Sequence, residues 1–271
     1  FEIVDGALEV KDYAIFERRP SEMFRLFAAA VELDVPIGLR TTDVLMDLAD
    51  AKGSEIREDP QAARWFLHVL CDERDAATPS RLEQMQDIGL LAALMPEWEP
   101  CTGRVQYDMY HVYTVDQHSL YSVALLKALA RAEPVDHHPQ PVQEMQLIER
   151  RLPLYVATLL HDVGKPLGRN HSAKGATVAA AIGWRLGLNE DDVSRVEFLV
   201  REHLTMGLIS QRRDLDEPGV VARFARLCDD EETLRELYLL TFCDLYCVGP
   251  GNLTTWKDDL LREFFRRTLV Y

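Results

Sequence analysis

The sequence predicts an all-α protein, in which a helical bundle follows an N-terminal helical linker subdomain. Apolar residues recur three and four positions apart along most of the 271 residues, and this spacing is typical of helices that bury one face. Alternation of apolar and polar residues, which is typical of strands, is confined to residues 1–20. A hydrophobic fraction of 47% supplies enough apolar side chains for a sizeable core.

The first part of the chain is expected to begin with short strands and to continue as helices. The alternation within residues 1–20 predicts short paired strands. Ser21 is a candidate N-cap for the first long helix. Further helices are expected from Thr41 or Thr42, from Asp59-Pro60, and from Ser80 to Leu94, the last being ended by the Pro96–Pro100 stretch.

The second part is expected to be helical throughout, interrupted by loops. Residues 134–141 are expected to form a loop, and Gly164, Pro166 and Gly168 predict a tight turn. The expected helices cover residues 114–131, 142–162 (one or two helices), 171–187, Asn189 to about Leu208, a stretch from Pro218, 230–247 and 253–268.

The charge balance limits the partners of this chain. Its formal net charge is -15, from 45 acidic and 30 basic residues. An acidic surface argues against binding to a nucleic-acid backbone, which requires a positive surface. A phosphate-bearing substrate is still possible, because a bound metal can reverse the local field.

Cysteine usage and hydropathy predict a cytoplasmic protein that does not enter a membrane. The five cysteines are odd in number and scattered, as is typical of reduced thiols rather than of a disulfide framework. No apolar run approaches the roughly 20 residues needed to span a bilayer. Because the chain begins at Phe1 without an initiating Met, we expect it to be a piece of something longer.

Four residues carry the signal for chemistry: His118, the adjacent pair His161-Asp162, and Asp244. Imidazole and carboxylate groups are suitable ligands for a divalent metal that activates water against a phosphate ester. Adjacent residues on a helix point about 100 degrees apart, so His161 and Asp162 cannot easily chelate an ion alone. They can converge on an ion at the helix end if other helices supply the remaining ligands.

The order His, His-Asp, Asp resembles the HD phosphohydrolase superfamily. Longer stretches resemble a narrower family, the bifunctional uridylyltransferase/uridylyl-removing enzymes of nitrogen signalling. The resemblance covers most of the chain and is carried by residues 110–118 (YHVYTVDQH), 161–165 (HDVGK), 171–176 (HSAKGA), 211–214 (QRRD) and 94–98 (LMPEW).

The resemblance implies a fold, a domain division and a partner. It implies an HD-type helical bundle over residues 108–271, preceded by the helical linker subdomain over residues 1–107. It also implies hydrolysis of the bond between UMP and a tyrosine of the PII signal protein. In that family a transferase domain precedes this region and glutamine-sensing ACT domains follow it. Neither is found in this sequence, so we expect no transferase activity.

The resemblance also extends the set of metal ligands. In HD relatives with two metals, histidines in comparable places bind the second ion, so His171 and His203 are candidates beside His118, His161, Asp162 and Asp244. Their alternatives are phosphate binding for His171 and a surface position for His203. The expected cofactor is one or two divalent ions, with Mn or Mg favoured over Fe or Zn.

Other residues receive supporting roles. Lys165, on the tight turn, is expected to offset negative charge on the phosphate, and with Asp162 and His171 it completes the predicted catalytic set. Arg212 and Arg213 could clamp the substrate phosphate, or could pair with nearby aspartates in a loop.

Outside the catalytic set, Asp116 could orient a ligand imidazole. His137 and His138 lie in a proline-rich loop and are expected to be exposed.

Two further functions compete with this hypothesis. The same site could act on a free nucleotide or a cyclic dinucleotide. Alternatively, the metal could be structural and the domain regulatory. The Gly164-Lys165 turn and the basic Arg212-Arg213 pair, which we expect near the ligands, argue against a purely structural site.

Overall fold

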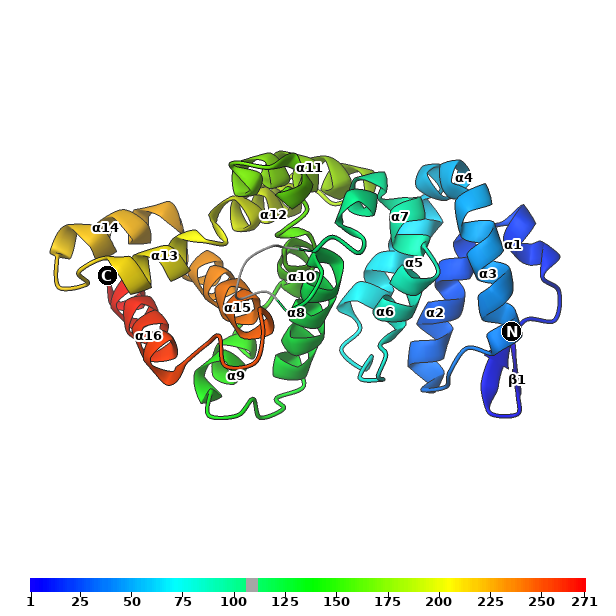
Figure 1. Ribbon diagram of the computed structural model, residues 1–271, viewed down its shortest axis with the longest axis horizontal. Helices are drawn as coiled ribbons and strands as arrows, with labels where there is room; N and C mark the ends of the chain where they lie inside the picture. The colour runs from blue at the N-terminus through cyan, green and yellow to red at the C-terminus, as the bar shows by residue number, and fades with distance from the viewer. Residues whose placement is uncertain (106–111) are drawn as a thin grey trace.

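The computed structural model describes residues 1–105 and 112–271. Helices are the dominant elements of the described chain and are arranged in an elongated row, with the N-terminal helices at one end and the C-terminal helices at the other (Figure 1). Strands in the described part form one antiparallel hairpin, β1 (Glu2–Val4) and β2 (Ala7–Glu9). The all-α prediction is therefore confirmed, including the short strands at the N-terminus.

The N-terminal half packs around two long helices, α2 (Ser21–Leu33) and α5 (Pro60–Cys71), which contact each other extensively. The apolar face of α2 is buried through Met23, Phe24 and Phe27. The other elements of this half are α1 (Ala14–Arg18), α3 (Leu39–Ala51), α4 (Gly53–Glu58), α6 (Arg81–Asp87), α7 (Leu90–Leu94) and the 3-10 helix η1 (Pro96–Cys101).

Several helix starts follow the capping chemistry of the sequence, but the helix expected from Thr41 or Thr42 begins earlier, at Leu39, with Gly38 at the N-cap. The Asp59 side chain accepts a hydrogen bond from the Gln61 N–H at 2.8 Å, and Ser80 forms a capping box with Glu83. The prediction for Ser21 was wrong in its detail. Pro20 occupies the N-cap position and Ser21 is the first helical residue.

The second half surrounds α10 (Arg151–Leu160), whose residues from Pro153 onward are all buried. Helices α5, α8 (Val115–Ala130), α12 (Glu190–Glu202) and α15 (Glu231–Cys247) pack against it. The remaining elements are α9 (Pro139–Met145), η2 (Lys165–Leu167), α11 (His171–Arg185), α13 (Thr205–Arg212), α14 (Pro218–Leu227) and α16 (Thr255–Val270).

Several expected helices are divided in the structure. Gly89 has a φ of +81° and separates α6 from α7 within the expected helix from Ser80 to Leu94. The expected helix from Asn189 ends at Glu202 and resumes as α13 after the His203-Leu204 turn. Helix α9 begins at Pro139, inside the expected loop, because proline suits the first helical turn.

A buried ion pair joins the two halves. The Lys127 ammonium group, on α8, lies 3.1 Å from Asp75 and donates a hydrogen bond of 2.9 Å to the Val69 carbonyl. Both charged side chains are at most 2% exposed. Asp75 also accepts a hydrogen bond from the Arg81 backbone N–H. The domain boundary between residues 107 and 108 falls outside the described residues and stays a prediction.

None of the described helices is long and apolar enough to cross a membrane. All five cysteines carry free thiols.

Candidate metal centre

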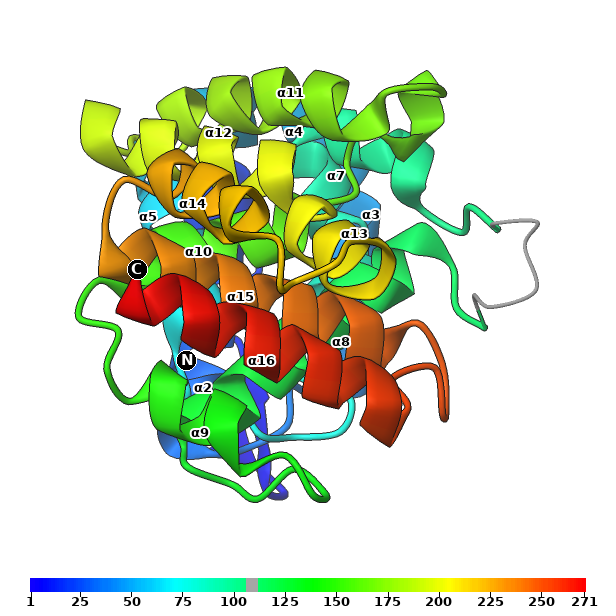
Figure 2. The same cartoon turned by 90° about the vertical axis from the view of Figure 1, so that its left-hand side faces the viewer.

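The six candidate ligands come from five helices that meet at one end of the bundle. In Figure 2, α11 and α12 run together above α15. His118 lies in the first turn of α8, His161 and Asp162 follow α10, His171 begins α11, His203 follows α12, and Asp244 lies in the last turn of α15.

Three of these residues form one group of potential ligands: His118, His161 and Asp244. The His118 Nε2 atom lies 3.1 Å from Nε2 of His161 and 3.0 Å from Oδ1 of Asp244. The Nδ1 atom of the same His118 ring lies 3.2 Å from the Cys247 carbonyl oxygen. A carbonyl can only accept a hydrogen bond, so Nδ1 carries the proton and Nε2 is the ring atom that faces the group.

Asp162, His171 and His203 form the second group. The two oxygens of Asp162 point in different directions. Its Oδ1 lies 3.8 Å from Nε2 of both His171 and His203, whereas its Oδ2 lies 3.3 Å from Nε2 of His161 and 3.9 Å from Nε2 of His118. One carboxylate therefore faces both groups.

The backbone also sets the tautomer of two other histidines. The Nδ1 atom of His161 lies 2.8 Å from the Thr158 carbonyl oxygen, and that of His203 lies 2.7 Å from the Val200 carbonyl oxygen. Each histidine immediately follows a helix and bonds to the carbonyl three residues earlier. As in His118, Nε2 is left facing the site with its lone pair, which is the form that binds a metal.

The two carboxyl groups are held in the charged form. Burial alone would raise the pKa of Asp162 and of Asp244. For Asp162 the neighbouring His161 and Lys165 outweigh burial, and its pKa lies well below the ordinary value. For Asp244 the imidazoles of His118 and His161 have the same effect. Both side chains are therefore anionic at neutral pH, as candidate metal ligands should be.

The histidines differ in how they respond to burial. Burial and the nearby His161 lower the pKa of His203 to about 4, and burial also lowers the pKa of His171. At His161 the carboxylates of Asp162 and Asp244 outweigh burial and raise the pKa. A cation beside His161 would be attracted by the same two carboxylates that favour its protonation.

Two buried nitrogen atoms without hydrogen-bond partners are consistent with a site that binds metal ions. The Nε2 atoms of His171 and His203 are buried and have no hydrogen-bond partner. Leaving such polar atoms unpaired is costly unless a ligand satisfies them. Four imidazoles and two carboxylates form a donor set suited to divalent transition metals. The cluster is therefore a candidate site for divalent metal ions.

The turn after Asp162 brings α11 against the candidate ligands. Gly164 packs directly on the backbone of α11, where an added Cβ would lie 2.1 Å from the His171 carbonyl oxygen and 2.6 Å from the Gly175 nitrogen. This close approach places His171 beside Asp162. On the same turn, the Lys165 ammonium group forms an ion pair with Asp162.

We expect Gly164→Ala to destabilise the fold by about 1–3 kcal/mol, because backbone atoms must shift to accept the methyl group. It should also lower metal affinity by displacing His171. The control is Gly207→Ala, since its Cβ would meet side-chain carbons at 3.5 and 3.7 Å, an ordinary contact. Urea unfolding with metal titration measures both effects. Equal stability of the two variants would contradict the packing argument.

Three other predicted site residues are Arg212, Arg213 and Asp116. Arg212 and Arg213 are exposed at the end of α13. Among the described residues, no hydrogen bond or ion pair joins either arginine to the two ligand groups. The role of both arginines in phosphate binding stays a prediction. Asp116 accepts hydrogen bonds from the Gln86 side chain and the Gly103 N–H. These bonds tie α8 to the first half of the chain, and orientation of an imidazole by Asp116 stays a prediction.

The prediction that His138 is exposed was wrong, and the backbone carbonyls that orient the imidazoles were not predicted. His138 is largely buried, with its Nδ1 atom 2.9 Å from Oδ2 of Asp258. His111, part of the resemblance, lies outside the described residues. The carbonyls of Thr158, Val200 and Cys247 orient three ligands, but a backbone group leaves no residue-type signal in a sequence.

Comparisons with known proteins agree with the geometry. The HD domain family profile matches residues 115–234, and the profile described as Uridylyltransferase GlnD third domain matches residues 1–94. Relatives align over nearly the whole chain. The chain is therefore similar to one region of these relatives, and residues 115–234 match an HD domain. The resemblance deduced from the sequence is thus confirmed.

Each of these relatives is a bifunctional uridylyltransferase/uridylyl-removing enzyme. The protein of Azospirillum brasilense is 37% identical over 267 residues, covering 98% of this chain and 28% of the relative. The protein of Caulobacter vibrioides strain NA1000 / CB15N is 38% identical over 263 residues, covering 97% of this chain and 28% of the relative. The protein of Bordetella avium is 34% identical over 272 residues, covering 100% of this chain and 32% of the relative. The chain therefore spans less than a third of the length of these relatives.

Proposed function

We propose that this chain hydrolyses the phosphodiester bond between UMP and a tyrosine of the PII signal protein. The observation that carries the proposal is the pair of ligand groups with Asp162 facing both. The names of the relatives supply the uridylyl group as the group that is removed. The PII tyrosine is what the family resemblance implies. We also propose the cytoplasm as its location, which is consistent with five free thiols.

The proposed reaction replaces one phosphorus–oxygen bond with another. A water oxygen bonds to phosphorus, while the bond to the tyrosine oxygen breaks and the phenolate leaves with the electron pair. Divalent ions held by the two groups would supply an activated water and would polarise the phosphoryl oxygens. A phenolate is a fairly good leaving group, so a dedicated acid is not required.

Residues of the chain contribute positioning and charge. Lys165 lies on the turn beside Asp162, where its ammonium group can offset negative charge that grows on the phosphate. His171 is partly exposed, unlike His161 and His203, and so lies on the solvent side of the ligand set. We propose that substrate approaches from this side.

The metal content is a separate part of the proposal. We propose two ions, with Mn or Mg favoured and with Fe or Zn as alternatives. Because His203 belongs to the second group, we expect His203→Ala to lower the bound metal from two ions per chain to one and to reduce hydrolysis. The control is His68→Ala, since His68 is a half-exposed residue on α5. Elemental analysis after metal loading measures the number, and an unchanged count would contradict ligation by His203.

Turnover of defined substrates tests the proposed function. The chain is stripped with a chelator and reloaded with single metals, and it is then given uridylylated PII, free nucleotides or a cyclic dinucleotide. We expect release of UMP from PII, loss of activity on stripping and recovery on add-back. Turnover of the free nucleotides or cyclic dinucleotide alone would overturn the PII assignment and favour a stand-alone phosphohydrolase. No turnover of any substrate with any metal would favour a structural site.

A further inference from the structure

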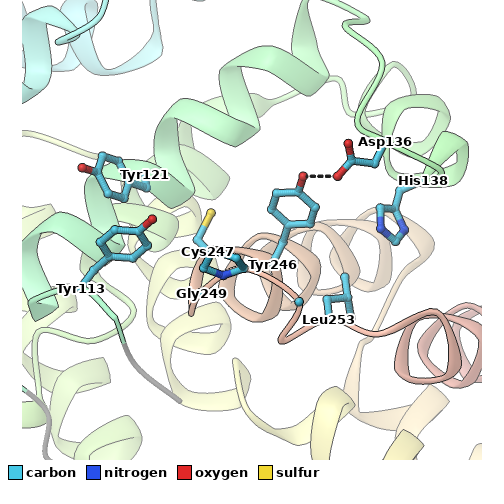
Figure 3. A pocket seen from close by; sticks show the side chains of 10 residues that line it. Tyr113, Tyr121, Asp136, His138, Tyr246, Cys247, Gly249 and Leu253 are labelled. Atoms are coloured by element: carbon cyan, nitrogen blue, oxygen red, sulfur yellow. Dashed lines mark hydrogen bonds between the residues drawn. The ribbon is translucent and has the colours of Figure 1, made fainter. Parts of the chain in front are cut away.

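A cavity of about 600 Å³ lies beside the metal centre, and none of the six candidate ligands lines it. Figure 3 shows Tyr113 and Tyr121 on one side of it and Tyr246 with Asp136 on the other, with Cys247 between them. The volume is within the range of about 300–1,000 Å³ that is usual for small-molecule sites.

The cavity wall continues the helices that hold the first ligand group. Tyr121 lies one turn after His118 on α8, and Cys247 lies one turn after Asp244 on α15. The Cys247 carbonyl oxygen lies 3.2 Å from Nδ1 of His118, so the same residue lines the cavity and orients a ligand. The cavity therefore adjoins the first ligand group through Cys247, which lies at the Nδ1 edge of the His118 ring.

The chemistry of the lining suits a planar ring with hydrogen-bond donors. The rings of Tyr113 and Tyr121 meet edge to face at 4.8 Å, and Tyr246 supplies a third aromatic ring. Aromatic side chains are the usual platforms on which nucleobases stack. Across the cavity, the Tyr246 hydroxyl donates a hydrogen bond of 2.6 Å to the Asp136 carboxylate. A carboxylate can accept further hydrogen bonds, because it offers about four lone-pair sites.

We infer that this cavity binds the nucleoside of the substrate while its phosphate lies at the metal centre. The inference rests on the proposed function and names the part of the substrate that the cavity recognises. A negative Asp136 disfavours a phosphate in the cavity but can accept a hydrogen bond from a base N–H or a ribose hydroxyl. An esterified tyrosine ring has no remaining hydroxyl to donate, so the nucleoside fits the lining better than the tyrosine does.

Two substrates separate a nucleoside site from a general effect on catalysis. Uridylylated PII contains a nucleoside, whereas methyl p-nitrophenyl phosphate is a phosphodiester that has a methyl group in place of the nucleoside and p-nitrophenolate as its leaving group. Because an aromatic stacking surface is lost, we expect Tyr121→Leu and Tyr246→Leu to raise KM for uridylylated PII about tenfold. The kcat/KM for methyl p-nitrophenyl phosphate should change less than about twofold, since its methyl group cannot stack on the tyrosine rings. The matched control is Tyr271→Leu, at an exposed tyrosine outside the cavity.

Binding of uridine alone gives a readout that does not require hydrolysis. Saturation-transfer NMR on the metal-free chain should detect uridine, and the Tyr121→Leu and Tyr246→Leu variants should weaken the signal. Circular dichroism establishes that each variant is folded, and Tyr246→Phe, which keeps the ring, should bind uridine better than Tyr246→Leu. Unchanged KM and unchanged uridine binding would overturn the inference, as would equal losses on both substrates. Uridine binding without hydrolysis of either substrate would instead reject the proposed function and leave the cavity assignment standing.

Discussion

Asp162→Asn is expected to lower kcat for the hydrolysis of uridylylated PII by about a thousandfold or more, which corresponds to roughly 4 kcal/mol of transition-state stabilisation. Asp162 faces both ligand groups and pairs with Lys165. An amide has no negative charge and offers one oxygen, so it cannot bind two cations as a carboxylate does. Steady-state kinetics at saturating Mn measures the loss.

The control for this variant is Asp192→Asn, which removes a buried carboxylate that pairs with Arg150 rather than with the metal ligands. Circular dichroism should show the same helical content for both variants. Hydrolysis should survive in Asp192→Asn. If Asp162→Asn kept more than a tenth of the wild-type kcat, the assignment of Asp162 to the reaction centre would be wrong.

Lys127→Met is expected to cost about 3–5 kcal/mol of stability, because it leaves the buried Asp75 carboxylate without its cation. Burial lowers the pKa of Lys127, and the charge of Asp75 opposes this shift. The pair lies between α8 and the first half of the chain, so its loss should weaken the contact between the halves. The free energy of unfolding in urea measures the effect.

A double variant separates the charge effect from packing. The double variant Lys127→Met/Asp75→Asn leaves no unpaired buried charge. The Asn oxygen can still accept the hydrogen bond that the Arg81 N–H donates to Asp75. Most of the lost stability should therefore return. The surface control is Lys52→Met, which breaks a partly exposed pair with Glu55 and should cost at most about 1 kcal/mol. A double variant as unstable as Lys127→Met would show that packing, not charge, dominates.

The sequence predicted the chemistry of the site better than its geometry. Metal ligands must be histidines or acidic residues, so His118, His161-Asp162 and Asp244 could be found from residue type and order. Their division into two groups depends on how five helices meet, and no local pattern encodes that. His138 illustrates the same difficulty, because its partner Asp258 lies 120 residues away.

The fold could be predicted for long amphipathic helices with strong capping residues. Helices α1 and α4 have five and six residues, too few for a clear apolar repeat. The break at Gly89 was also missed, since a glycine within a helical pattern can continue the helix or end it. Lys127 has the residue type of an ordinary surface position, and only the packing of α8 shows that it is buried.

The bonds from ligand imidazoles to helix-end carbonyls connect metal affinity to the fluctuations of the bundle. Thr158, Val200 and Cys247 lie in the last turns of α10, α12 and α15, where helices normally fray. By thermodynamic linkage, an ion at a hundred times its dissociation constant stabilises the folded state by about 2.7 kcal/mol per site. The ions would therefore suppress local opening of these helix ends, and slower amide hydrogen exchange there should accompany metal loading.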